Sequence, residues 1–129
     1  MIYVIDTHAL VWYLEGDNKL GPKAREIMRG ENKRLIIPTI VLAEIRYLFS
    51  KGKIDRSLNK IFEIIEEDAR CIVYPLDVNV VEFMPSKLEI HDAIICATAM
   101  LYRDLLSEDV KVITRDEEIT SSQLIDVVW

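Results

Sequence analysis

The 129-residue sequence contains few of the residues that mark linkers, disulfide frameworks or membrane spans. It has four glycines, four prolines and two cysteines, and glycine, serine and proline nowhere gather into a linker. No apolar run approaches the ~20 residues of a transmembrane helix. The first apolar run, residues 2–5, stops at Asp6 and is too short for a signal peptide. We therefore expect one domain, residues 1–129, in the cytoplasm.

The two cysteines lack the paired spacing of a zinc site. Cys71 and Cys96 are far apart in the sequence, and both stand in apolar surroundings beside isoleucine. Free cysteine behaves in such surroundings as a small hydrophobic residue. We predict two buried thiols that take no part in metal binding.

Positive charge is also scarce, since 16 basic residues face 22 acidic ones and the net charge is −6. Proteins that bind nucleic acid usually carry a basic footprint, because phosphate contacts require one. The total charge therefore counts against a nucleic-acid partner. Divalent cations bound by several of the acids would reverse the local field, so the placement of the acids matters more than their number.

Half of the residues are hydrophobic, and short apolar runs alternate with helical patterns along the chain. The predicted strands are residues 2–5, 35–37, 71–74, 110–113 and 125–128. The predicted helices are residues 8–14, 22–29, 39–51, 58–69, 78–83 and 93–102, with Thr39 as a cap of the third. Most of the strands are continuously apolar, as in a sheet covered on both faces. The alternation predicts an α/β fold, a three-layer α/β/α domain with a central parallel sheet.

Two aspartates follow predicted strands. Asp6 comes directly after the first strand, and Asp116 comes shortly after the fourth. Ligands of parallel α/β sheets bind at the carboxyl ends of the strands, so both positions favour a functional site. Helix capping is the alternative for Asp6, because aspartate is a good N-cap. Glu117 and Glu118 compete for the role of Asp116, which we prefer because it lies nearest to the strand.

Glu44 is an acid with apolar neighbours on its predicted helix. The residues three and four positions away are Ile40, Val41, Tyr47 and Leu48, and no basic residue is placed to pair with it. A buried carboxylate without a partner takes up a proton or finds a cation. A protonated or distantly paired structural glutamate is the alternative.

Asp92 precedes a segment that is apolar on nearly every side and therefore belongs at the centre of the domain. The simplest role for Asp92 is to cap that helix. A cap on a central helix would face the same crevice as the strand ends, so capping and metal binding do not exclude each other.

Four carboxylates at one edge of a sheet favour a site for hard cations. Mg²⁺ and Mn²⁺ take oxygen ligands, and in nucleases they orient a water molecule and stabilise the charge of the transition state. No thiolate or histidine cluster competes for a softer metal. The only histidines, His8 and His91, flank the proposed ligands, and we expect local hydrogen bonding from them rather than catalysis.

Four segments carry these acids in order along the chain, namely residues 6–14, 38–45, 91–99 and 112–116. Together they resemble the motifs of the PIN-domain nucleases, and in particular those of the VapC-type toxins of prokaryotic toxin–antitoxin pairs. The resemblance covers nearly the whole chain. It implies a metal-dependent endoribonuclease that hydrolyses RNA phosphodiester bonds and leaves a 5′-phosphate.

By this resemblance the catalytic residues, which also bind one or two Mg²⁺ or Mn²⁺ ions, are Asp6, Glu44, Asp92 and Asp116. Thr7 and Thr114 would support them, Thr114 by hydrogen bonding. Arg115 stands where many members carry a small polar residue. The basic residues near the acids would contact RNA phosphates; they are Arg46, Lys51, Lys53 and Arg115.

The resemblance also implies a homodimer and a cognate antitoxin that places a basic side chain near the acids. Trp12, Tyr47 and Phe49 would line its groove, with packing in the core as the alternative. A second hypothesis is a PIN-like RNA- or protein-binding module that has lost catalysis. A third, a phosphatase or response-regulator-like domain using Asp6, is disfavoured because Thr7 and His8 stand where adjacent acids would be needed.

Overall fold

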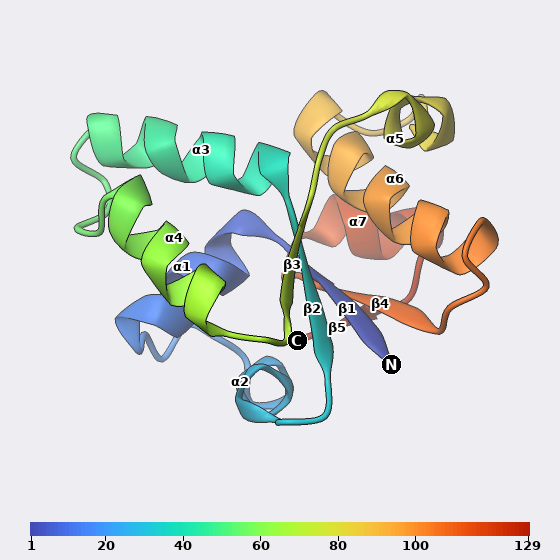
Figure 1. Ribbon diagram of the computed structural model, residues 1–129. Helices are drawn as coiled ribbons and strands as arrows, with labels where there is room; N and C mark the ends of the chain where they lie inside the picture. The colour runs from blue at the N-terminus through green and yellow to red at the C-terminus, as the bar shows by residue number, and fades with distance from the viewer.

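The computed structural model describes residues 1–129 and contains five strands in one parallel sheet (Figure 1). The strands are β1 (Ile2–Ile5), β2 (Arg34–Pro38), β3 (Cys71–Tyr74), β4 (Val110–Ile113) and β5 (Val127–Val128). Their order across the sheet is β3-β2-β1-β4-β5, and every neighbouring pair is parallel. The strand that begins the chain therefore lies in the middle of the sheet.

Helices cover both faces of the sheet, so the predicted three-layer α/β/α architecture is confirmed (Figure 1). On one side lie α1 (Thr7–Glu15), α2 (Pro22–Arg29), α3 (Thr39–Ser50) and α4 (Leu58–Glu67). On the other lie α5 (Val78–Phe83), α6 (Ile90–Asp104) and α7 (Glu117–Ser122). None of these helices combines the length and apolar character needed to cross a bilayer.

The position of each strand in the sheet explains its burial. All four residues of β1 are buried, since it pairs with β2 and β4 and is covered on both faces. β3 has a neighbour only on the β2 side, and its Ile72 and Val73 are more than a third exposed. Cys71 lies on this edge strand and is only half-buried, which contradicts the prediction of a buried thiol, whereas Cys96 on α6 is fully buried as predicted.

α6 packs against the centre of the sheet, where it contacts both β1 and β4. Its buried residues include Ala93, Ala97 and Ala99, whose small side chains let the helix approach the sheet closely. The helix begins at Ile90, earlier than predicted, and Glu89 is its N-cap residue. The alternative role of Asp92 as a cap of this helix is therefore excluded, because Asp92 lies inside the first turn, where its carboxylate serves no cap.

Two further local predictions differ from the structure. Pro38, not Thr39, is the N-cap residue of α3, and the Thr39 hydroxyl instead accepts a hydrogen bond from the backbone N–H of Leu76 at 3.0 Å. α7 was not predicted. Its six residues include Thr120, Ser121 and Ser122, which have modest helix propensity, and its first turn is stabilised by Asp116 as the N-cap.

Candidate active site

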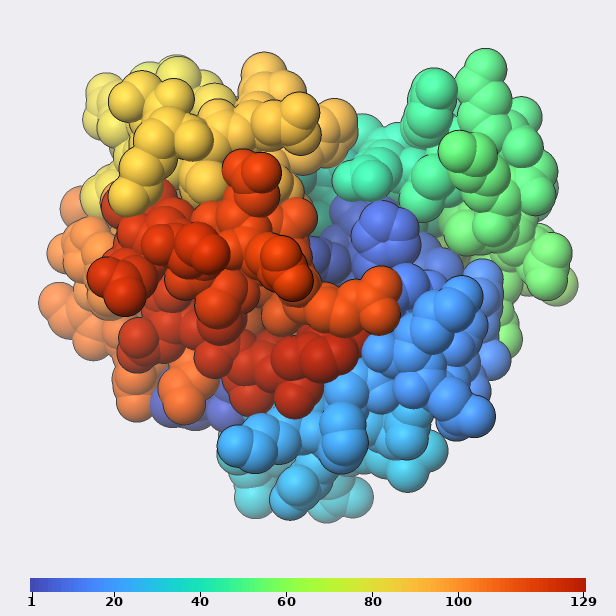
Figure 2. Space-filling model, turned by 180° about the vertical axis from the view of Figure 1, so that it is seen from behind, coloured from blue at the N-terminus to red at the C-terminus, as the bar shows by residue number.

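A pocket of about 210 Å³ at the carboxyl edge of the sheet brings the four predicted acids together. Asp6 follows β1 and Asp116 precedes α7, while Glu44 lies in the second turn of α3 and Asp92 in the first turn of α6. The pocket is lined by Asp6, Thr7, His8, Glu44, Glu89, His91, Asp92, Ile95 and Asp116. On the surface, a hollow lies where the segments of α1, α3 and α6 meet (Figure 2). Four helices thus contribute to one crevice.

Asp6 is held by three hydrogen bonds. Its Oδ1 accepts from the backbone N–H groups of His8 at 2.9 Å and Ala9 at 3.3 Å, so Asp6 is the N-cap of α1. Its Oδ2 accepts from the Thr114 hydroxyl. Burial raises the pKa of Asp6, and these hydrogen bonds oppose that rise. Asp6 therefore caps α1 and also lines the pocket, and its Oδ2 retains a free lone pair for a further ligand.

Thr114 links two of the acids from a position that is 2% exposed. Its hydroxyl donates to Asp6 and accepts from the backbone N–H of Asp116 at 3.0 Å. Asp116 in turn caps α7, because its Oδ1 accepts from the N–H of Ile119 at 3.0 Å. Of the three adjacent acids only Asp116 lines the pocket, and neither Glu117 nor Glu118 does.

Replacing Thr114 with valine is expected to destabilise the protein by about 2 kcal/mol, because one hydroxyl serves two partly buried hydrogen bonds. Thr114→Ser, which keeps the hydroxyl, should retain most of the stability. Denaturant unfolding of the two variants beside wild type measures the difference. Equal stability of Thr114→Val and Thr114→Ser would show that the hydroxyl bridge contributes nothing.

Glu44 lines the pocket, and a hydrogen bond from Thr7 orients its side chain. Its Oε1 accepts a hydrogen bond from the Thr7 hydroxyl at 2.9 Å, and Thr7 itself is buried. The predicted apolar surroundings of Glu44 are only partly correct. Val41 is buried, but Tyr47 is 58% exposed, with the Lys51 amino group over its ring at 5.5 Å. Glu44 therefore lies at the boundary between the core and the pocket.

Asp92 differs from the other acids because no hydrogen bond reaches its carboxylate, although it is only partly exposed. Burial is the largest cause that raises the pKa of Asp92, and together with the nearby charges of Asp116, Asp6, Glu89 and Glu118 it brings that pKa to about 6. A carboxylate in such surroundings gains from a proton or from a cation. A cation in the pocket would therefore stabilise the ionised form of Asp92.

The chemistry of the pocket fits a hard divalent cation. Its acidic donors are carboxylate oxygens, which Mg²⁺ and Mn²⁺ prefer, and no cysteine lines it. No three His, Cys, Asp or Glu side chains stand close enough together to form a complete metal site. Two of the acids are engaged by threonine hydroxyls, and like charges keep the carboxylates apart. The pocket therefore contains carboxylate oxygens suited to Mg²⁺ or Mn²⁺, but they are not already arranged as a complete coordination shell.

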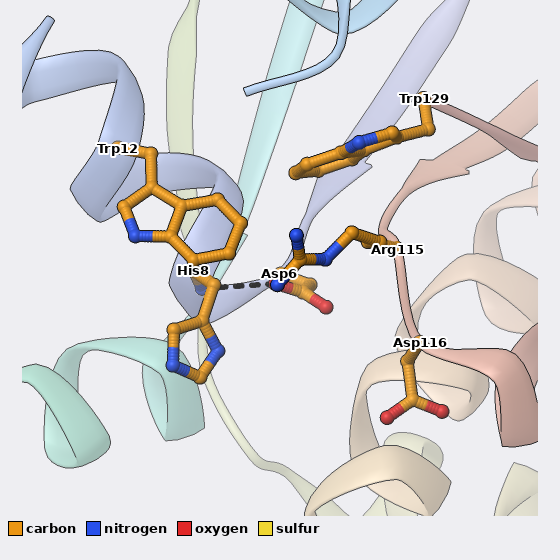
Figure 3. Close-up of a pocket in the computed structure, with 6 residues that line it drawn as sticks. All are labelled: Asp6, His8, Trp12, Arg115, Asp116 and Trp129. Atoms are coloured by element: carbon orange, nitrogen blue, oxygen red, sulfur yellow. Dashed lines mark hydrogen bonds between the residues drawn. The ribbon is translucent and has the colours of Figure 1, made fainter. Parts of the chain in front are cut away.

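Only one of the four predicted RNA contacts lies beside the acids. Arg115 lines a neighbouring pocket, with its guanidinium 4.6 Å from the centre of the Trp12 ring (Figure 3). Arg46 lines a separate surface pocket with Phe49, and neither Lys51 nor Lys53 lines the acidic pocket. The basic groups of α3 and the loop after it are therefore separated from the acids.

The sequence did not draw attention to Trp129 or Glu89. Trp129 lies in the pocket with Trp12 and Arg115, and Glu89 lines the acidic pocket. The rarity of tryptophan, with two in the chain, was the one available signal for Trp129. Of the three aromatic residues predicted to line a groove, Trp12 borders the site, while Tyr47 and Phe49 are exposed on α3.

Comparison with known proteins supports the fold and identifies the family. The chain is similar in fold to VapBC2 from Rickettsia felis, whose crystal structure contains a DNA fragment from their promoter, with a TM-score of 0.70 and 19% sequence identity. The alignment covers 100% of this chain and 99% of that one. No curated protein matches the sequence significantly. The family model of the PIN domain matches residues 3–121, which is most of the chain, and the chain therefore belongs to the PIN domain family.

Proposed function

We propose that this chain, a single PIN domain over residues 1–129, is a metal-dependent endoribonuclease of the VapC type, the toxin of a toxin–antitoxin pair. The observation that carries the proposal is the convergence of four acids from four parts of the chain on one pocket. Asp92 has no hydrogen-bond partner and a pKa raised to about 6, so a cation in the pocket would stabilise its carboxylate. Membership of the PIN family and the likeness to VapBC2 support the assignment.

In this proposal Asp6, Glu44, Asp92 and Asp116 hold one or two Mg²⁺ or Mn²⁺ ions. A bound ion would supply a more acidic water and neutralise charge on the phosphate that is attacked. Thr7 orients Glu44, and Thr114 orients Asp6 through the hydrogen bonds described above. Since ligands must be deprotonated to bind metal, Asp92 makes cation binding weaker below about pH 6.

The acidic charge of the chain is consistent with an RNA substrate in this arrangement. Without a cation, the carboxylates of the pocket would repel a phosphate, so substrate binding at the acids depends on the metal. Arg115 is the basic residue nearest to the acids and is the proposed phosphate contact at the site. Arg46, Lys51 and Lys53 would contact phosphates farther along the strand.

The test is cleavage of end-labelled single-stranded RNA by the purified protein with Mn²⁺, with Mg²⁺ and with EDTA. We expect cleavage with either metal, products that carry a 5′-phosphate and no cleavage in EDTA. Hydrolysis of a small phosphate ester, without RNA cleavage, would instead indicate a phosphatase. RNA binding without cleavage under any metal condition would favour the inactive binding module.

We further propose a cognate antitoxin and a homodimer, both acting in the cytoplasm. The acidic pocket attracts cations of either kind, so basic side chains of the antitoxin should meet the four acids and compete with metal. Hydrogen exchange on the complex with a co-purified partner would locate its footprint. Protection confined to the face opposite Asp6 and Asp92 would contradict this mode of inhibition.

A further inference from the structure

A second pocket, of about 200 Å³, adjoins the acidic one and has a different chemistry (Figure 3). It is lined by Asp6, His8, Trp12, Arg115, Asp116 and Trp129. Asp6, His8 and Asp116 line both pockets, so the two are continuous. Both tryptophans of the chain lie here.

The Trp12 ring is the centre of this second pocket. Trp129 meets it edge-on at 5.8 Å between ring centres, and the His8 ring lies 5.3 Å away. Two cations also lie over it, with the Arg115 guanidinium at 4.6 Å and the Lys19 amino group at 5.6 Å. In a chain with a net charge of −6, positive groups thus gather around one aromatic ring beside the acids.

Arg115 makes no hydrogen bond and no ion pair, although Asp6 and Asp116 line the same pocket. Its guanidinium contacts the rings of Trp12 and, at 6.0 Å, Trp129. An arginine has five N–H donors, and none of them is engaged by the protein. The side chain is exposed, so it can turn from the ring to an incoming anion.

Trp129 is fixed in the pocket by close packing against Gly21. A Cβ atom at Gly21 would lie 2.5 Å from the carbonyl carbon of Trp129 and 2.6 Å from its ring atom Cδ1. The φ of Gly21 is −61°, which any residue adopts, so glycine is needed here for space. The preceding Val128 is held by the sheet, because its carbonyl accepts from the N–H of Thr114 at 3.2 Å. Trp129 is thus held in place by the fold and forms a fixed side of the second pocket.

We propose that this pocket binds one unstacked nucleobase of single-stranded RNA, with the base on the Trp12 ring and an adjacent phosphate on Arg115. The inference rests on the proposed function and adds a nucleotide subsite beside the bond to be cleaved. Single-stranded RNA is recognised by stacking of splayed bases on aromatic side chains and by cations along its backbone. Lys19 and Arg115 lie over the Trp12 ring, so the charges nearest this ring favour an anionic ligand, whereas basic side chains are attracted to the acids of the neighbouring pocket.

Intrinsic tryptophan fluorescence reports on this pocket alone, because both tryptophans line it. The protein is titrated in Ca²⁺, which also takes oxygen ligands and offsets the charge of the acids, with a short single-stranded RNA, with an abasic strand of equal phosphate number and with a hexa-arginine peptide. A denaturing gel checks that the RNA stays intact. We expect RNA to quench the fluorescence at a concentration about tenfold lower than the abasic strand, in line with stacking of one base. Equal quenching by RNA and the abasic strand, or quenching by the peptide alone, would overturn the proposal.

Variants assign the effect to the residues named. Trp12→Leu should weaken binding of a labelled RNA about tenfold in an anisotropy titration, whereas Trp12→Phe, which keeps an aromatic face, should bind nearly as wild type. Arg115→Gln, at an exposed position, should weaken binding of both RNA and the abasic strand. Arg29→Gln, exposed at the end of α2, is the matched control and should change neither. Wild-type RNA affinity in both folded Trp12→Leu and Arg115→Gln would refute the subsite.

Failure of the subsite and failure of the proposed function give different results. A protein that binds RNA with base-dependent quenching but does not cleave it with Mn²⁺ retains the subsite and loses the nuclease assignment. A protein that cleaves RNA, and whose Trp12→Leu variant binds and cleaves as wild type, retains the nuclease assignment and loses the subsite.

Discussion

Replacement of Asp92 with asparagine is expected to lower the rate of metal-dependent RNA cleavage by at least about 100-fold, since changes to groups that only support metal ligands already cost up to that factor. Asp92 has no hydrogen bond to lose and caps no helix. The substitution therefore removes charge and a ligand oxygen while leaving the surrounding contacts in place. The measurement is the initial rate of RNA cleavage with Mn²⁺.

Asp126→Asn is the matched control for this experiment. Asp126 is exposed just before β5, lines neither pocket and should keep the wild-type rate when substituted. Circular dichroism and melting curves establish that the Asp92 variant is folded. A folded Asp92→Asn protein that cleaves at the wild-type rate would remove Asp92 from the mechanism.

Asp6 gives a less direct test than Asp92. Its carboxylate caps α1 and accepts from Thr114, so substitution alters local structure as well as charge. Asparagine is also a good N-cap, which preserves the helix, but its side-chain nitrogen can no longer accept the Thr114 hydrogen bond. Loss of cleavage in Asp6→Asn should therefore be accompanied by some loss of stability, which Asp92→Asn should not show.

The second large expected effect is on stability. Mn²⁺ at a hundredfold excess over its dissociation constant should raise the free energy of unfolding by about 2.7 kcal/mol, if only the folded protein binds it. For a domain of this size the rise in Tm should be roughly 10 °C. Asp92→Asn should blunt this response. A thermal-shift series with EDTA, Mg²⁺ and Mn²⁺ measures it, and an equal response in wild type and Asp92→Asn would contradict metal binding at this residue.

Without metal, the raised pKa of Asp92 makes the stability depend on pH. Its pKa rises from 3.8 to about 6 on folding, so the folded state holds a proton that the unfolded state releases. The penalty is absent below about pH 3, grows as pH rises through the unfolded value and is complete above about pH 6. Because Asp92 is partly exposed, the penalty should amount to only about 1 kcal/mol.

Asp92→Asn removes this penalty, so the metal-free variant should melt above wild type near pH 7 and equal to it near pH 3. Melting curves in EDTA across this range give the comparison. A variant that melts below wild type near pH 7 would mean that the Asp92 carboxylate stabilises the metal-free fold.

The strands and the location of the acids could be predicted because each depends on a local pattern with a simple physical cause. The residues of β1 are apolar without interruption and those of β4 are interrupted only by Lys111, because those strands are covered on both faces. Asp6 follows β1 directly and Asp116 follows β4 after two residues, and parallel strands bring their carboxyl ends to one edge. The three-layer fold and the shared pocket follow from these two facts.

Features that depend on packing between distant segments could not be predicted. Trp129 borders the site only because β5 lies beside β4 and Gly21 leaves room for the ring. Helix periodicity placed Tyr47 among apolar neighbours, but the turn that carries it faces solvent. Capping stayed open as the alternative role of Asp92 because the apolar run starts after it, whereas the helix extends back to Ile90 through two polar residues.

The central position of β1 has a consequence for how the chain folds during synthesis. Asp6 and its hydrogen-bond partner Thr114 are 108 residues apart in the sequence, and β4, which completes one edge of β1, emerges just before Thr114. Contacts between such distant segments make folding slow. A nascent chain that lacks β4 leaves one side of its middle strand open, and it carries three of the four acids. The acidic pocket is therefore incomplete until Asp116 has left the ribosome, so under the proposed function a nascent chain without β4 and Asp116 should not cleave RNA.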